Sequence, residues 1–91
     1  MKHNFNHIIN QPIEAEIHVA DNLISLRKLK QLTQEELACI CGVTKNTISS
    51  LERNEFMPSL TLLIKLCLAL NCRLGDLIEI YDFRSEQNIY L

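Results

Sequence analysis

A short row of polar side chains in the middle of the sequence has the chemistry to read hydrogen-bonding groups on another molecule. Lys45 can donate to O6 or N7 of guanine, and Asn46 can pair with N6 and N7 of adenine through its amide. Ser49 and Ser50 either donate or accept, so they read sequence weakly, and Arg53 completes the row. These residue types favour recognition of nucleic acid. A polar row is also what a merely solvated helix face looks like.

The spacing of the row places it on one side of a helix. The polar residues stand at i, i+1, i+4, i+5 and i+8, which share one face at 3.6 residues per turn. Apolar residues form the opposite stripe: Val43, Ile48 and Leu51. The pattern predicts a helix that Thr44 caps and that Arg53-Asn54 closes.

A second short helix is predicted directly before it. Thr33-Gln-Glu-Glu36 is a capping box, in which Thr33 and Glu36 satisfy each other's backbone amides. The helix that follows would bury Leu37, Ala38 and Cys41 and end at Gly42, because glycine tolerates a left-handed turn. Two such helices must brace each other at a steep angle, so that the polar row faces outward with dimensions that fit a DNA major groove.

The flanking segments predict a strand and three more helices. Residues 13–19 alternate apolar and polar after Pro12, which is the period of a half-buried strand. From Asp21, a plausible N-cap, the spacing is helical, with Leu23, Leu26, Leu29 and Lys30. The fourth helix opens at Pro58-Ser59, ends at Asn71 and has as its expected apolar face Leu60, Leu63, Ile64, Cys67 and Leu70. A fifth is marked by Leu74, Leu77, Ile78 and Tyr81. The tail from Phe83 is either a short strand at Ile89–Leu91 or frayed.

Composition and charge agree with a small helical protein. The 91 residues suffice for one modest core, which must be aliphatic since 47% are hydrophobic and only 5% aromatic. The net charge is −2, which argues mildly against a nucleic-acid partner, but residues 22–56 hold five basic groups against four acidic ones. Without a signal-peptide pattern or an apolar run of about 18 residues, we expect a cytoplasmic protein with no membrane contact.

The cysteines and histidines give no pattern typical of a metal site. We expect reduced thiols, since Cys39-x-Cys41 is too tight for a zinc knuckle and Cys67 and Cys72 have core-like spacing. Cys39 is the thiol expected at the surface, where a redox role is an open alternative. His3, His7 and His18 are not expected to bind metal, and Asp76, Glu79 and Asp82 are expected on a solvated face. No nucleophile–base pair or cofactor-binding loop is present, so we predict neither an enzyme nor a cofactor.

The order of these motifs resembles the Cro and phage-repressor (XRE) helix-turn-helix family. The resemblance covers roughly residues 19–80 and rests on five stretches: Leu26–Ala38, Gly42-Val43-Thr44, Thr47-Ile48-Ser49, Leu51-Glu52 and Pro58-Ser59-Leu60. It implies an all-α, five-helix, lambda-repressor-like domain at residues 20–81, after an extension at 1–19 with a short β-strand and before a tail at 82–91. Such domains bind double-stranded operator DNA, usually as dimers.

The resemblance also implies roles for single residues. Lys45, Asn46 and Ser50 match base-reading positions, and Ser49 lies on the same face. Positions near the phosphate backbone are matched by Arg27, Gln34, Thr44, Thr47 and Arg53. Gln34 would also buttress the recognition helix, and Arg27 would form an ion pair with Glu52 that links the first and third helices.

Several residues depart from the family pattern. Arg73 replaces the usual small N-cap of the fifth helix, and apolar residues stand where polar ones are common: Leu29, Ile40, Leu62 and Leu68. Together with the strand at 13–19 they suggest a covered surface. A lone strand leaves an unpaired edge, so we expect it to pair with Ile89–Leu91 or with its own copy in a dimer.

Three functions are compatible with these features. The first is a sequence-specific transcription regulator, a repressor that occludes a promoter by binding a pseudo-palindromic operator as a homodimer. The second is an antitoxin that also masks a small protein partner with its extra apolar surface. The third is a protein-interaction module that has kept the fold and lost DNA binding.

Overall fold

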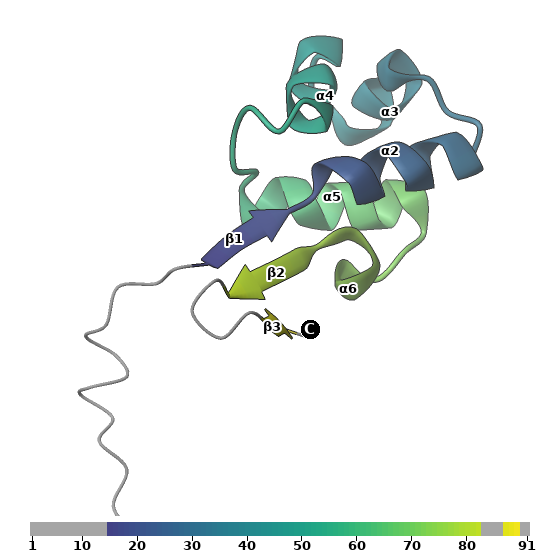
Figure 1. Ribbon diagram of the computed structural model, residues 1–91. Helices are drawn as coiled ribbons and strands as arrows, with labels where there is room; N and C mark the ends of the chain where they lie inside the picture. Colours follow the sequence, from purple (N-terminus) through teal and green to yellow (C-terminus); the bar gives the residue numbers. More distant parts are fainter. Residues whose placement is uncertain (1–14, 83–86, 90–91) are drawn as a thin grey trace, which may run out of the picture.

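The computed structural model describes residues 15–82 and 87–89, and the side chains of residues 17–80. Within these residues the element order is β1 (Ala15–His18), α2 (Ala20–Leu29), α3 (Gln34–Cys41), α4 (Lys45–Glu52), α5 (Leu60–Leu70), α6 (Leu74–Leu77), β2 (Glu79–Asp82) and β3 (Gln87–Ile89) (Figure 1). The expected His3, His7, Pro12, Ile13, Glu14, Tyr90 and Leu91 features lie outside the described residues. The five-helix, lambda-repressor-like fold predicted from the sequence is confirmed.

The helices enclose one aliphatic core. α3 packs against α4 and α5, α4 also packs against α2, and α6 packs against both α2 and α5. The fully buried side chains come from every helix: Leu23, Leu37, Ile48, Leu51, Leu66, Leu70 and Leu77. In Figure 1 α3 and α4 form one end of the molecule, and the small sheet lies at the opposite end.

The helix ends follow the predicted capping residues closely. Thr33 accepts from the amide of Glu36 at 3.0 Å and donates its own amide to the Glu36 carboxylate at 2.9 Å. Gly42 and Asn71 have left-handed backbones, with φ of 69° and 50°, and end α3 and α5. Ser59 caps α5 as expected. The predicted start of α2 is wrong, because its N-cap is Val19 and Asp21 lies in the first turn.

The structure corrects the predicted apolar face of α5. Leu60 and Ile64, expected in the core, are 63% and 49% exposed, whereas Leu62, expected as an extra surface leucine, is buried. The true inner face is Leu62, Leu63, Leu66 and Leu70. Since α5 has apolar residues on almost every side, periodicity alone could not choose the face.

The sheet has three antiparallel strands in the order β1-β2-β3. β1 pairs with β2 in the register Ala15↔Asp82 to His18↔Glu79, and β2 pairs on its other side with β3. Direct pairing of the first strand with Ile89 is therefore wrong, although Ile89 belongs to the same sheet. The predicted fifth helix is also shorter than expected, because Ile78 ends it and Tyr81 lies in β2. Ile78 and Ile80 pack in or against the core, and Glu79 lies between them. This alternation of apolar and polar residues suits a strand with one face on the core.

Candidate nucleic-acid interface

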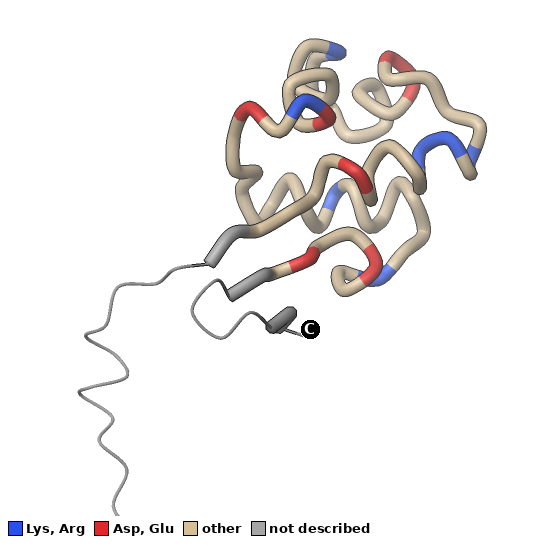
Figure 2. Tube along the Cα trace, in the orientation of Figure 1, with Lys and Arg blue, Asp and Glu red and all other residues tan. Residues whose placement is uncertain are grey.

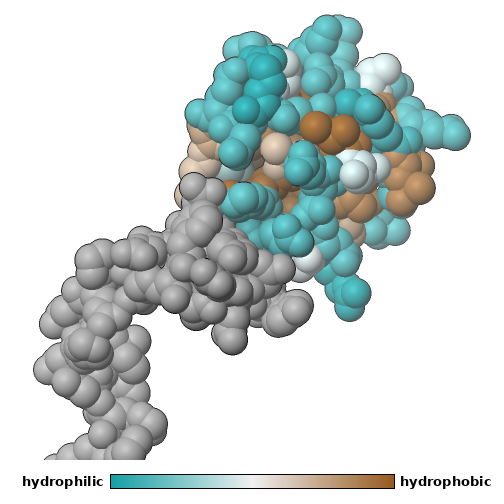
Figure 3. Space-filling view, viewed as in Figure 1, coloured by the Kyte–Doolittle hydropathy of each residue, from teal (hydrophilic) through white to brown (hydrophobic). Residues whose placement is uncertain are grey.

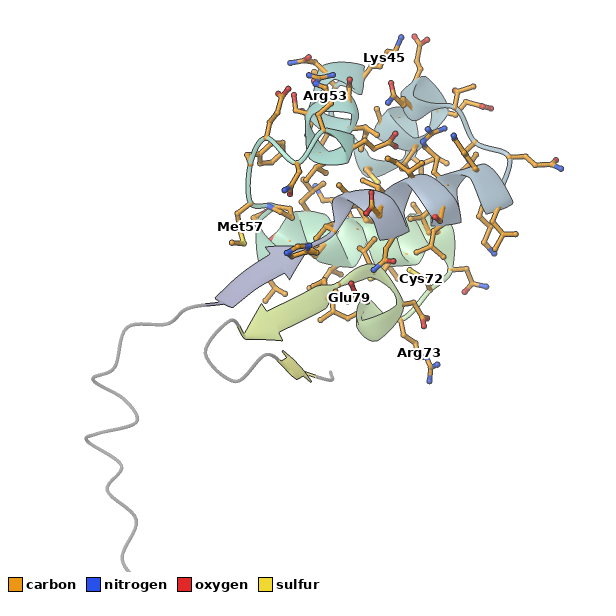
Figure 4. All side chains as sticks on the ribbon, in the orientation of Figure 1. Lys45, Arg53, Met57, Cys72, Arg73 and Glu79 are labelled. Carbon is orange, nitrogen blue, oxygen red and sulfur yellow. The ribbon has the colours of Figure 1, made fainter. Side chains whose placement is uncertain are left out.

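The N-terminal end of α4 presents its polar side chains to solvent. Thr44 caps the helix by accepting from the amide of Thr47 at 3.2 Å, and the two hydroxyls are 3.0 Å apart. Lys45 and Asn46, in the first turn, are exposed, while Ile48 and Leu51 on the other face are buried. α4 therefore holds its first turn outward from the core (Figure 4).

The two serines of the polar row are less available than the first turn. Ser49 and Ser50 are half-buried, and both side-chain oxygens accept from the guanidinium of Arg53, at 3.3 Å in the case of Ser50. Glu55 holds the same guanidinium, with Nε 2.5 Å from one carboxylate oxygen and Nη2 3.3 Å from the other. Arg53 thus lies folded over the second half of the polar row.

Glu55 is a residue of this surface that the sequence analysis missed. Asn54 has a left-handed backbone, with φ of 57°, which turns the chain back so that Glu55 meets the arginine two residues earlier. The hydrogen bond from Arg53 lowers the pKa of the Glu55 carboxyl. Asn54 could have indicated this position in the sequence, because a left-handed residue after a helix reverses the direction of the chain.

A network of three side chains braces α4 against α2 and α3. Arg27 donates from Nε and Nη2 to the two oxygens of Glu52, at 2.6 and 3.0 Å. Gln34 Nε2 donates to Glu52 Oε1 at 3.0 Å, and Arg27 Nη1 donates to the Leu32 carbonyl at 2.7 Å. The structure thus contains the ion pair and the buttressing contact that the resemblance implied.

The network is shielded from water. The Arg27 and Glu52 side chains are 12% and 6% exposed. Burial alone would raise the pKa of Glu52, but the hydrogen bonds from Arg27 and Gln34 and the nearby charges outweigh it, so the pKa is lowered.

Arg27 gives three of its five N–H donors to protein acceptors, which leaves two for any other contact. Lys28 lies close enough to lower the pKa of Glu52 by its charge, a position that the sequence analysis did not single out.

Both signs of charge lie around this end of the molecule. In Figure 2 lysine and arginine lie on α4 and at the end of α2, and acidic residues lie at the start of α3, at the end of α4 and in the loop that follows α4. Figure 3 shows mostly hydrophilic residues over α3 and α4, with hydrophobic residues below them. Across residues 15–82 and 87–89, no helix has the length and hydropathy to cross a bilayer. The same part of the chain holds no cluster of three or more metal-ligating side chains.

Residues 23–77 match the helix-turn-helix family, which is more than half of the chain. The chain belongs to the helix-turn-helix family. It is 38% identical over 69 residues to the control protein C.SmaI of Serratia marcescens, covering 76% of this chain and 82% of that one. The match and the fold make this chain a DNA-binding transcription regulator of the Cro and phage-repressor type.

Two solved structures resemble this helix-turn-helix regulator closely. The restriction-modification controller protein C.AhdI of Aeromonas hydrophila superposes with a TM-score of 0.63 at 32% identity, covering 66% of this chain and 91% of that one. The P22 c2 repressor protein, in complex with a synthetic operator, superposes with a TM-score of 0.62 at 30% identity, covering 65% and 89%.

Proposed function

We propose that this regulator recognises a specific operator through the first turn of α4. The observation that carries the proposal is that Lys45 and Asn46 are exposed side by side while Ile48 and Leu51 anchor the same helix in the core. An α-helix is about 10–12 Å across and the major groove about 12 Å wide, so α4 fits with its first turn at the base edges. Lys45 would read guanine and Asn46 adenine, each worth about 1–3 kcal/mol of discrimination.

The residues around α4 are proposed to hold the phosphate backbone. Thr44 and Thr47 stand at the helix start, where free amides and the helix dipole favour an anion. Gln34 and Arg27 would contact phosphate while they hold Glu52, Arg27 through its two remaining N–H groups. Arg53 would contact phosphate beside Ser49 and Ser50, which are assigned the weaker base contacts.

We further propose that the regulator acts as a homodimer on a pseudo-palindromic operator. One α4 offers few base contacts, so two half-sites read together give the specificity that one lacks. Phe56, Met57 and Leu60 are 41%, 64% and 63% exposed and follow α4 in the chain, which suits an apolar contact beside the recognition helix (Figure 4 labels Met57). A dimer placed across a promoter would act as a repressor.

In this proposal residues 20–81 form the DNA-binding domain, with 1–19 as an extension and 82–91 as a tail. We also propose that the regulator acts in the cytoplasm, where its DNA target would lie. Catalysis and cofactors play no part in the proposal.

The test is selection of bound sequences from a random DNA pool with the full chain. We expect an inverted repeat with half-site centres about 10 base pairs apart, or a multiple of this. Binding should fall steeply as salt rises, because each neutralised phosphate releases counterions. An unenriched pool, with no salt-dependent binding, would favour a protein-interaction module instead.

An antitoxin is the second candidate, favoured by the apolar side chains on the other helices. Leu29, Ile40 and Leu68 are 75%, 58% and 77% exposed, which is more than a helix surface needs for folding. Here the regulator would also bind a small protein. Expression together with its neighbouring genes distinguishes the two candidates, since an antitoxin would co-purify with one of their products in a fixed ratio.

A further inference from the structure

The end of α5 brings two cysteines together. Asn71 is left-handed, its amide donates to the Leu68 carbonyl at 3.4 Å, and the Cys72 amide donates to the Cys67 carbonyl at 3.0 Å. This pair of hydrogen bonds is a Schellman motif, which sets the side chain in the last turn against the side chain just beyond the cap. Apolar residues usually occupy these two positions. Here both are cysteines.

The two thiols are free, in contact and partly open to solvent. Both side chains are half-buried. Burial raises the pKa of Cys72 to about 11, together with the neighbouring Cys67, which adds charge and a side-chain hydrogen bond. Figure 4 places Cys72 at the connection between α5 and α6, at the other side of the core from Lys45. The contact between the thiols serves no step of DNA recognition.

We propose that Cys67 and Cys72 form a reversible intramolecular disulfide when the protein meets a hydroperoxide. The Schellman motif brings the two residues together at the end of one helix, and their side chains already share a hydrogen bond, so we expect the bridge to form without movement of a helix. The two positions are also adjacent to solvent, so peroxide can reach them, whereas Cys41 is buried.

The reaction balances with peroxide as the only co-reactant. Cys67, as its thiolate, attacks one oxygen of the peroxide, the O–O bond breaks, and a sulfenic acid and a hydroxide form. The hydroxide takes up the proton that Cys67 released. Cys72 then attacks the Cys67 sulfur, the S–O bond breaks, and the leaving hydroxide takes the Cys72 proton as water. Two thiols are oxidised to one disulfide and hydrogen peroxide is reduced to two waters.

The bridge would tie the last turn of α5 to the start of α6. α6 contributes Leu77 to the core, and the Leu77 carbonyl accepts from Asn22 on α2 at 3.2 Å. A cross-link at this point restricts the unfolded chain and leaves α4 where it is. We therefore expect the oxidised protein to unfold at a higher temperature and to bind DNA as before. This inference does not depend on the proposed operator contacts.

The test uses the full chain with Cys39 replaced, Cys39→Ser, so that the exposed thiol cannot cross-link two molecules. One equivalent of hydrogen peroxide should lower the intact mass by two hydrogen atoms and protect two thiols from alkylation. Peptide mapping should join Cys67 to Cys72, and dithiothreitol should reverse the change. The midpoint of thermal unfolding should rise by roughly 10 °C.

Two variants serve as matched controls. Cys67→Ser and Cys72→Ser in the same background should each retain the native fold by circular dichroism, lose the disulfide and show no thermal shift with peroxide. The proposal is overturned if both cysteines remain alkylatable in the treated protein, if mapping finds another pair, or if the bridged form is less stable than the reduced one.

Discussion

Arg27 on α2 grips Glu52 on α4 with two parallel hydrogen bonds, 2.6 and 3.0 Å long, in a place where both side chains are nearly hidden from water. A fork of this kind fixes direction as well as distance. Because Glu52 ends α4 and its Oε1 also accepts from Gln34 of α3, one carboxylate sets the angle between three helices. The orientation of the first turn of α4 depends on it.

Loss of either partner should therefore be costly. Arg27→Ala leaves a shielded carboxylate without its cation, and we expect a loss of about 3 kcal/mol in the free energy of unfolding. Glu52→Ala should have a similar effect. Urea unfolding of both single variants and the double variant checks this. The double variant should lose much less than the sum, and additive losses would show that the two residues do not act as a pair.

The same carboxylate predicts how stability depends on pH. The pKa of Glu52 is lowered on folding from an ordinary value of 4.5, so its contribution is fully present above pH 4.5 and is lost as pH falls through the folded value. Glu52→Gln cannot titrate. The stability difference between wild type and Glu52→Gln should thus shrink as the pH falls below 4.5. A difference that stays constant over this range would show that the Glu52 pKa is the same in both states.

Two leucines on α5 test whether the stability of the protein depends on burial of the side chain or only on its hydrophobicity. Leu66 is fully buried and Leu68, half a turn away, is 77% exposed. We expect Leu66→Ala to cost about 2–5 kcal/mol and Leu68→Ala less than about 0.5 kcal/mol in urea unfolding of the isolated protein. Equal costs would place the wrong face of α5 in the core.

Glu55 offers a test of the second half of the polar row. It holds Arg53 over Ser49 and Ser50, and its negative charge would face the DNA backbone. Glu55→Gln should raise DNA affinity at low salt, with the gain fading as salt rises. Arg53→Ala should reduce the slope of log affinity against log salt by about 1. Unchanged affinity in both variants would remove Arg53 from the interface.

The sequence was most informative where one residue type serves one backbone need. Thr33 with Glu36, Gly42, Thr44, Ser59 and Asn71 marked helix ends because each satisfies amides or tolerates a left-handed turn. The Arg27–Glu52 pair could be named only from the family resemblance, since residues 25 positions apart carry no local signal.

The sequence was least informative where short apolar runs fit two structures. Helical spacing joins Leu74, Leu77, Ile78 and Tyr81, but only the first two lie in a helix, and Tyr81 lies in a strand. A segment this short does not show enough periods to distinguish a helix from a strand. α5 is apolar nearly all round, so its buried face depends on the helices that surround it. The pairing of β1 with β2 joins residues more than 60 positions apart and follows from the fold rather than from either segment.

The central claim is that Lys45 and Asn46 read bases, and the direct measurement is affinity for the selected operator and its single base-pair variants. Lys45→Ala and Asn46→Ala should each bind the operator about 10-fold or more weakly and lose discrimination at one base pair only. Lys65→Ala, which removes an equal charge from an exposed position on α5, should keep the full pattern of discrimination. If Lys45→Ala and Asn46→Ala discriminate among the variants as wild type does, the first turn of α4 does not read the operator.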